Sequence, residues 1–94
     1  MKIIQIKSED ELDIYLKDIS PYDKYLKFLL GEVNRTLLDY FAYDNYIDFG
    51  AFVELKIILS TYLAFKYNVD VVPIDLTKFF CNINGLDYDA YISD

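Results

Sequence analysis

A chain of 94 residues has room for one hydrophobic core, so the sequence predicts a single domain over residues 1–94. It contains no histidine, which removes the commonest general base, proton shuttle and metal ligand. The formal net charge of −7 opposes contact with nucleic-acid backbones and anionic membranes, so we expect neither direct nucleic-acid binding nor membrane binding.

The N-terminal residues predict a short strand followed by a helix. Residues 2–6 are rich in isoleucine, which favours an extended segment. Ser8 and Glu11 have the spacing of a capping box, so a helix should run from about Glu9 to Asp18. The apolar residues of this helix recur at helical spacing and indicate one buried face.

The longest predicted helix begins at Ser20 and Pro21 and ends near Phe41. Serine can cap a helix and proline fits its first position, while apolar residues recur at helical spacing as far as Phe41. Gly31 inside this helix costs about 1 kcal/mol relative to alanine, and it predicts a close helix crossing, a kink or a break. Residues 42–50 are expected to form a loop, because Asp44 and Asn45 are turn formers.

A third helix is expected from about Ala51 to Tyr67. It has so few polar residues that it should be the central helix, packed on more than one side. Asn68 suits the position that follows its C-terminus. Residues 69–72 are rich in valine and precede a proline, so they predict an extended segment that pairs with residues 2–6.

The C-terminal part predicts a short helix that Asp75 caps and that runs through Cys81, with a last helical turn or an ordered tail after Gly85. Cys81 is the only cysteine, which excludes an intrachain disulfide, and its apolar neighbours favour a small buried hydrophobe. The segments together predict a mainly α fold. It should be a compact single-domain bundle of four to five helices, with one short two-stranded pairing of residues 2–6 with 69–72.

The sequence offers no signal for membrane insertion or secretion. No apolar run approaches the roughly 18 residues that a transmembrane helix needs. The N-terminus turns acidic at residues 8–11, where a signal peptide would continue apolar. We therefore expect a cytoplasmic protein.

Catalysis and cofactor binding find little support. The three glycines are far apart, so the chain has neither a P-loop nor a dinucleotide-binding fingerprint. Carboxylates remain as metal ligands, but an EF-hand loop that starts at Asp44 would need glycine at Phe49 and glutamate at Leu55. We expect no enzymatic activity, no cofactor and no metal site.

The most informative segment is residues 37–52, where aromatic residues and aspartates interleave without lysine or arginine. Tyrosine combines a large apolar area with a hydroxyl, which favours it at protein interfaces, and neighbouring aspartates would select a basic partner. Residues 87–91 repeat this chemistry. By contrast, Tyr15, Tyr25 and Tyr62 lie on the apolar stripes of predicted helices and are expected in the core. The candidate partner-binding residues are Asp39, Tyr40, Tyr43, Asp44, Tyr46, Asp48, Asp87, Tyr88, Asp89 and Tyr91.

These features predict a non-enzymatic acidic binding protein that neutralises or regulates a basic partner protein. Immunity proteins, antitoxins and phage-encoded inhibitors of host defences are of this type. In one version, the aspartates occupy the positions that nucleic-acid phosphates would take on the partner. The alternative is a structural, self-assembling helical protein whose aromatic surface is a homo-oligomer interface. A third class is a helical bundle that binds a small ligand.

Overall fold

The computed structural model describes residues 4–18, 22–43 and 49–89 of the chain. These residues form a mainly helical fold with one very short sheet, which confirms the predicted helical bundle. The elements in chain order are β1 (Ile4–Gln5), α1 (Glu9–Asp18), α2 (Lys24–Tyr43), α3 (Phe49–Tyr67), β2 (Val69–Asp70) and α4 (Pro73–Ile83).

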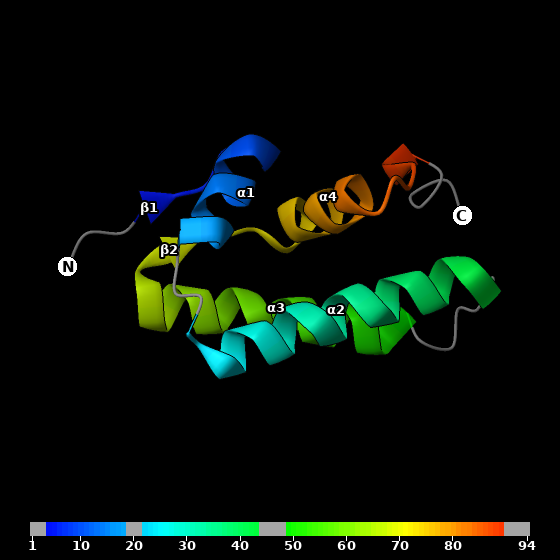
Figure 1. Cartoon of the computed structure of the whole chain (residues 1–94), viewed down its shortest axis with the longest axis horizontal. Coiled ribbons are helices and arrows are strands. Elements are labelled where there is room, and N and C mark those ends of the chain that lie inside the picture. The colour runs from blue at the N-terminus through cyan, green and yellow to red at the C-terminus, as the bar shows by residue number, and fades with distance from the viewer. Residues whose placement is uncertain (1–3, 19–21, 44–48, 90–94) are drawn as a thin grey trace.

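The helices form two layers. Figure 1 shows α2 and α3 side by side along the long axis, with α1 and α4 on one side of this pair. Helix α4 contacts α1, α2 and α3, so it joins the layers. Strands β1 and β2 pair in parallel, with Ile4 opposite Val69, and this confirms the predicted pairing.

The hydrophobic core lies where α4 meets the α2–α3 pair. Leu12, Val33, Leu37, Phe52 and Leu63 have no exposed surface and come from three of the helices. Further core residues are Leu26, Leu29, Leu59, Val69, Leu76, Phe80 and Cys81. The sequence prediction that Cys81 is a small buried hydrophobe is therefore confirmed.

The N-terminus of α1 has the predicted cap. The Glu11 backbone N–H donates a hydrogen bond of 3.2 Å to Ser8 Oγ. The Glu11 carboxylate accepts a bond of 2.9 Å from the backbone N–H of Lys7, one residue earlier than a capping box requires. The bond to Ser8 satisfies a donor that the first turn of the helix leaves unpaired, and the bond from Lys7 ties the residue before the cap to the helix.

Two other predicted helix starts are wrong. Helix α2 begins at Lys24, because Asp23 is its N-cap and accepts a hydrogen bond of 3.0 Å from the Leu26 backbone N–H. Pro21 lies outside the described residues. Helix α4 begins at Pro73 and not at an Asp75 cap, since proline lacks the N–H that the first turn would leave unpaired.

The ends of α2 and α3 differ from the predicted loop as well. Tyr43 and Phe49 are helical, so the segment between the helices is shorter than the predicted loop of residues 42–50. Residues 44–48 lie outside the described ranges. Asn68 has a φ of 58°, as expected for the residue that follows a helix C-terminus. No helix within the described ranges is long and apolar enough to cross a membrane.

Of the predicted alternatives for Gly31, a close helix crossing and a break into two helices are wrong. Helix α2 continues through Gly31, which is exposed, and a Cβ atom there would meet no atom within 4 Å. Nothing in its surroundings requires glycine.

Replacing Gly31 with alanine should therefore raise the free energy of unfolding by about 0.5 to 1 kcal/mol, because alanine restricts the unfolded chain and favours the helix. Urea denaturation measures the change. Gly85→Ala is the matched control: its φ of 67° lies in the left-handed region, so the same added methyl should destabilise the protein. A loss of stability in Gly31→Ala would contradict this account.

Candidate functional site

The two sides of α3 bury different amounts of apolar surface. Phe52, Leu59 and Leu63 recur on the side that packs into the core, and all three are fully buried. On the opposite side, Ile57 is 50% exposed and Phe65 is 84% exposed. Helix α3 contacts α2, α4 and β2, so the prediction that it is packed on more than one side is confirmed, but one apolar stripe of the helix stays open.

Helix α2 adds aromatic residues beside this stripe. The ring of Tyr25 stacks on Phe28 with centroids 6.3 Å apart and meets Tyr62 edge-on at 4.9 Å. Tyr25 is half-exposed, so its predicted place in the core is wrong. A shallow hollow of about 380 Å³ lies between the two helices. We call this surface the outer face; its residues are Tyr25, Phe28, Ile57, Ile58, Thr61, Tyr62 and Phe65.

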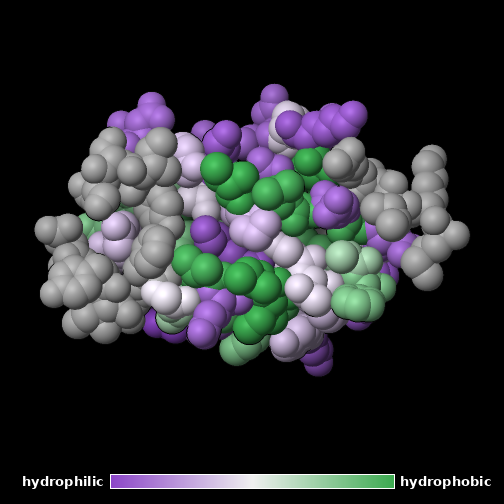
Figure 2. All heavy atoms as spheres, turned by 180° about the vertical axis from the view of Figure 1, so that it is seen from behind, coloured by the Kyte–Doolittle hydropathy of each residue, from purple (hydrophilic) through white to green (hydrophobic). Residues whose placement is uncertain are grey.

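Charge is divided between the two layers. The described residues of the layer with α1 and α4, 4–18 and 69–89, carry nine carboxylates and three lysines, a balance of −6. Those of the α2–α3 layer, 22–43 and 49–67, carry four carboxylates and five basic side chains, a balance of +1. Figure 2 shows hydrophilic side chains along the edge formed by the first layer and hydrophobic ones across the middle of the surface. The acidic field and the exposed aromatic residues therefore lie in different layers.

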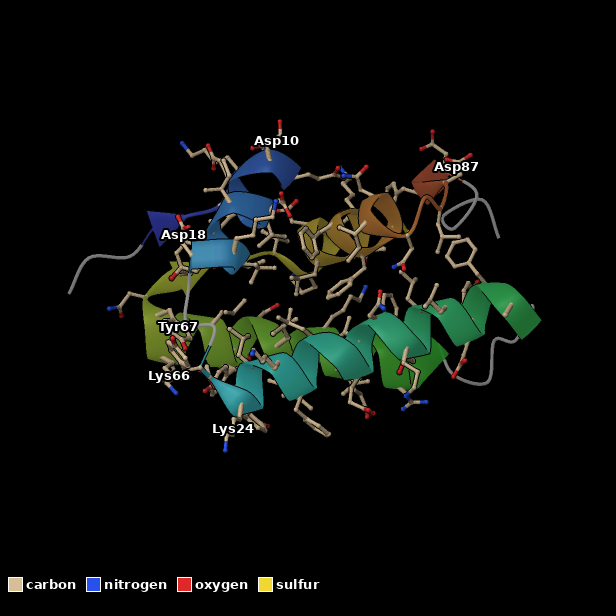
Figure 3. The ribbon with its side chains drawn as sticks, in the orientation of Figure 1. Asp10, Asp18, Lys24, Lys66, Tyr67 and Asp87 are labelled. Atoms are coloured by element: carbon tan, nitrogen blue, oxygen red, sulfur yellow. The ribbon has the colours of Figure 1, made fainter. Side chains whose placement is uncertain are left out.

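The two ends of the α2–α3 layer carry opposite charge. Lys24 and Lys66 lie at the end where α2 begins and α3 finishes (Figure 3). A second hollow of about 320 Å³ extends from the middle of the layer toward the other end, and its lining includes Glu32, Asp39 and Glu54. Arg35 lies among these carboxylates, 2.7 Å from Glu32 and 3.4 Å from Asp39. One end is thus basic and the other is acidic on balance.

A buried carboxylate, Asp23, binds groups of both helices at the basic end of the α2–α3 layer. Asp23 is 7% exposed, and it accepts hydrogen bonds of 3.0 and 2.8 Å from the Tyr62 hydroxyl. The Tyr67 hydroxyl also donates to it, and Lys66 Nζ lies 3.1 Å away. The pKa of Asp23 lies well below its ordinary value. The hydrogen bond from Tyr67 is the largest cause, and the bond from the Leu26 backbone N–H is the next.

This network positions the outer face. Because the Tyr62 hydroxyl is bound to Asp23 at the start of α2, its ring is held at the edge of the exposed aromatic group. Lys66 Nζ donates a bond of 2.9 Å to the same hydroxyl, and this bond, followed by the one to Asp23, raises the pKa of Lys66. The start of α2 is thereby fastened to the end of α3.

A second buried charge lies between α3 and α4. Lys56 is 7% exposed, and its Nζ donates a bond of 2.6 Å to Thr77 Oγ1 and lies 4.5 Å from the Phe52 ring centroid. Burial lowers the pKa of Lys56 and raises that of the nearby Cys81 thiol. A raised pKa keeps Cys81 as a thiol, which is a poor nucleophile and a poor metal ligand. Among the described residues, no three acidic or cysteine side chains are grouped so that they could hold a metal ion.

The predicted partner-binding residues of α2 have neighbours within their own helix. Asp39 pairs with Arg35, and the ring of Tyr40 meets Phe41 edge-on at 5.7 Å. Tyr43 is the last residue of α2. The remaining predicted residues of this segment, Asp44, Tyr46 and Asp48, lie outside the described residues.

The C-terminal group of predicted residues follows α4. Tyr88 packs against the core and has Lys78 Nζ 5.4 Å from its ring centroid, so it is a partly buried residue. Asp87 and Asp89 are exposed, and the Asp89 backbone N–H donates to the Asp87 carboxylate at 3.0 Å. Figure 1 shows the C-terminal ends of α2 and α4 toward the same end of the molecule. Tyr91 lies outside the described residues.

Comparison of the chain with protein-family models, curated proteins and solved structures finds no match. Function must therefore be inferred from the chain itself. Sequence reasoning missed the outer-face residues Phe28, Ile57, Ile58, Thr61 and Phe65. The available signal was the shortage of polar residues on α3, since the residues left after a buried stripe is assigned are mostly apolar as well.

Proposed function

We propose that this chain is a non-enzymatic, cytoplasmic protein-interaction domain that docks against another protein chain through its outer face. The observation that carries the proposal is the exposure of five large apolar side chains around one hollow: Tyr25, Phe28, Ile57, Ile58 and Phe65. Large contiguous apolar patches are uncommon on the surfaces of monomeric proteins and mark interaction sites.

The composition of the outer face also supports a protein partner. Three aromatic rings and two isoleucines line its hollow, and charged residues lie toward its ends, which is the usual anatomy of a protein–protein interface. Phe65 is its most exposed large apolar residue, so it has the most apolar area to lose on binding. Buried aromatic residues of this kind dominate the binding energy of such interfaces.

A second candidate is the predicted binding of a basic protein, for inhibition of the immunity, antitoxin or anti-defence type. It is supported by the balance of −6 on the layer with α1 and α4. A field of this sign would attract a basic partner and speed its association. The aromatic residues with the greatest exposure lie on the other layer, so this candidate relies more on charge than on apolar contact.

The test is affinity recovery of bound protein from the cells that produce the chain, with matched variants. We expect Phe65→Asp to reduce recovery by more than tenfold, because a charge in the centre of an apolar interface would be buried without a partner. Ile14→Asp is the control: Ile14 is 61% exposed on α1, and its replacement should leave recovery within about twofold. Both sites are exposed, so thermal melting should confirm that both variants fold.

A third variant separates the two candidates. Asp10→Lys with Asp13→Lys reverses charge on α1 without touching the outer face. If this variant loses the bound protein and Phe65→Asp keeps it, the acidic layer is the binding site and the proposed role of the outer face is wrong.

A further inference from the structure

We propose that the chain docked on the outer face is a second copy of this protein, packed antiparallel about a two-fold axis beside Thr61. The inference rests on the proposed function, because it assigns the occupant of the same surface. It is argued from the order of residues along α3, from the charges at the two ends of the layer and from the size of the face.

On the exposed side of α3, the residues four positions before and after Thr61 are both large and apolar, Ile57 and Phe65. Glu54, Ile57, Thr61 and Ala64 recur at spacings of four and three residues, which is the spacing of a helix seam that packs on another helix. An axis beside Thr61 places Ile57 of each copy opposite Phe65 of the other copy. The small side chains of Thr61 and Ala64 then meet near the centre, where they allow the two helices to approach closely.

The end charges select the antiparallel orientation. In this arrangement Lys24 and Lys66 of one copy lie toward the same end as Asp39 and Glu54 of the other. Glu54 is seven residues from Thr61 and Lys66 is five residues from it, so their positions on opposing helices differ by about 3 Å along the axis. A parallel pair would bring like charges together at both ends. The helix dipoles also favour the antiparallel pair.

The distribution of the remaining charge favours the same surface. Contact through the α2–α3 layer joins two surfaces with a balance of +1 and leaves both acidic layers on the outside of the dimer. Contact through the layers with α1 and α4 would instead join two surfaces with a balance of −6. The self-repulsion of a chain with net charge −7 is therefore smallest when the outer faces meet.

The whole α2–α3 surface, of which the outer face is the apolar part, approaches the area that a small homodimer needs. Helix α3 has 19 residues, so it is about 28 Å long, and two adjacent helices are about 20 Å wide. A flat area of about 560 Å² follows, and the relief of the side chains raises the accessible area above it. Specific interfaces bury about 800 Å² on each partner. A two-fold contact closes after two copies, so it produces a dimer and no filament.

Disulfide formation at the axis tests the orientation. When the axes of the two packed helices are 8–10 Å apart, the Cα atoms of two facing residues on the seam are about 4–6 Å apart, which a disulfide spans. We expect Thr61→Cys to form an intermolecular disulfide within minutes under mild oxidation at about 50 μM protein. The unsubstituted chain sets the background, because its own Cys81 is 1% exposed.

Glu54→Cys is the matched control on the same stripe. In the antiparallel pair, residue 54 of one copy lies about 21 Å along the helix axis from residue 54 of the other. Glu54→Cys should therefore form the disulfide at least tenfold more slowly than Thr61→Cys. A mixture of Glu54→Cys with Asn68→Cys should yield the mixed disulfide, since these positions face each other. Equal rates for Glu54→Cys and Thr61→Cys would overturn the antiparallel arrangement.

Light scattering on the unsubstituted chain tests the association itself. We expect twice the monomer mass of 11.1 kDa at about 100 μM, and the monomer mass for Thr61→Arg, which places two cations at the axis. A monomer at up to about 1 mM would overturn the second copy as occupant. In that event, loss of bound cellular protein in Phe65→Asp would still support the proposed function, and its retention would reject both.

Discussion

Replacing Asp23 with alanine should lower the melting temperature of the protein by roughly 10 to 20 °C. The change removes the N-cap of α2 and leaves the hydroxyls of Tyr62 and Tyr67 without the carboxylate that accepts their hydrogen bonds. It also removes the carboxylate partner of Lys66 at the same place. Differential scanning calorimetry measures the effect, and Asp39→Ala is the control. Asp39 is in an ion pair with the exposed Arg35, so its loss should shift melting by less than about 2 °C.

The acid dependence of stability gives a second test of Asp23. Its pKa is lowered in the folded protein, so in acid the unfolded chain binds a proton before the folded chain does. Its contribution is complete above the ordinary pKa of 3.8 and is lost as the pH falls below that value. Asp23→Asn keeps a capping side chain but does not titrate. The difference in melting temperature between the native protein and Asp23→Asn should therefore shrink below about pH 4. A constant difference from pH 7 to pH 2 would contradict the assigned role.

The helices could be predicted from sequence because the core residues of each helix recur at helical spacing. The pairing of β1 with β2 was also predictable, since both strands lie in segments rich in β-branched residues next to a predicted helix. The start of α2 was not. Ser20 and Pro21 form a stronger local signal than Asp23, whose role depends on Tyr62 and Tyr67, about forty residues further along the chain. Tertiary contacts of this kind leave no local pattern.

The outer face was missed for a related reason. A helix that is apolar on all sides predicts burial on all sides, and α3 is of this type. Only the placement of α4 and α2 decides which stripe is covered, and the chain has no further described helix to cover the other one. The predicted binding site rested on local composition, the interleaved aspartates and tyrosines of residues 37–52. In space, the most exposed aromatic side chains and most of the acidic charge lie in separate layers.

Two substitutions of Lys56 should separate what its buried stem contributes to the free energy of unfolding from what its charge contributes. We expect Lys56→Ala to lower the free energy of unfolding by about 2 to 3 kcal/mol, because it opens a cavity beside Phe52. Lys56→Met keeps an apolar stem of similar length and removes the buried cation, so it should be neutral or stabilising by about 1 kcal/mol. Urea denaturation of both variants measures the difference.

The pH dependence of stability shows whether the buried Lys56 cation causes the difference between the native protein and Lys56→Met. The pKa of Lys56 is lowered by burial, so the unfolded chain holds its proton up to a higher pH than the folded chain does. The native protein should then gain stability relative to Lys56→Met as the pH rises toward the ordinary lysine value of 10.5. If Lys56→Met is as unstable as Lys56→Ala at pH 7, the bond to Thr77 and the contact with Phe52 outweigh the cost of burying the cation. If the native protein gains stability as the pH rises and Lys56→Met does not, then burial of the charge, and not poor packing, limits stability between α3 and α4.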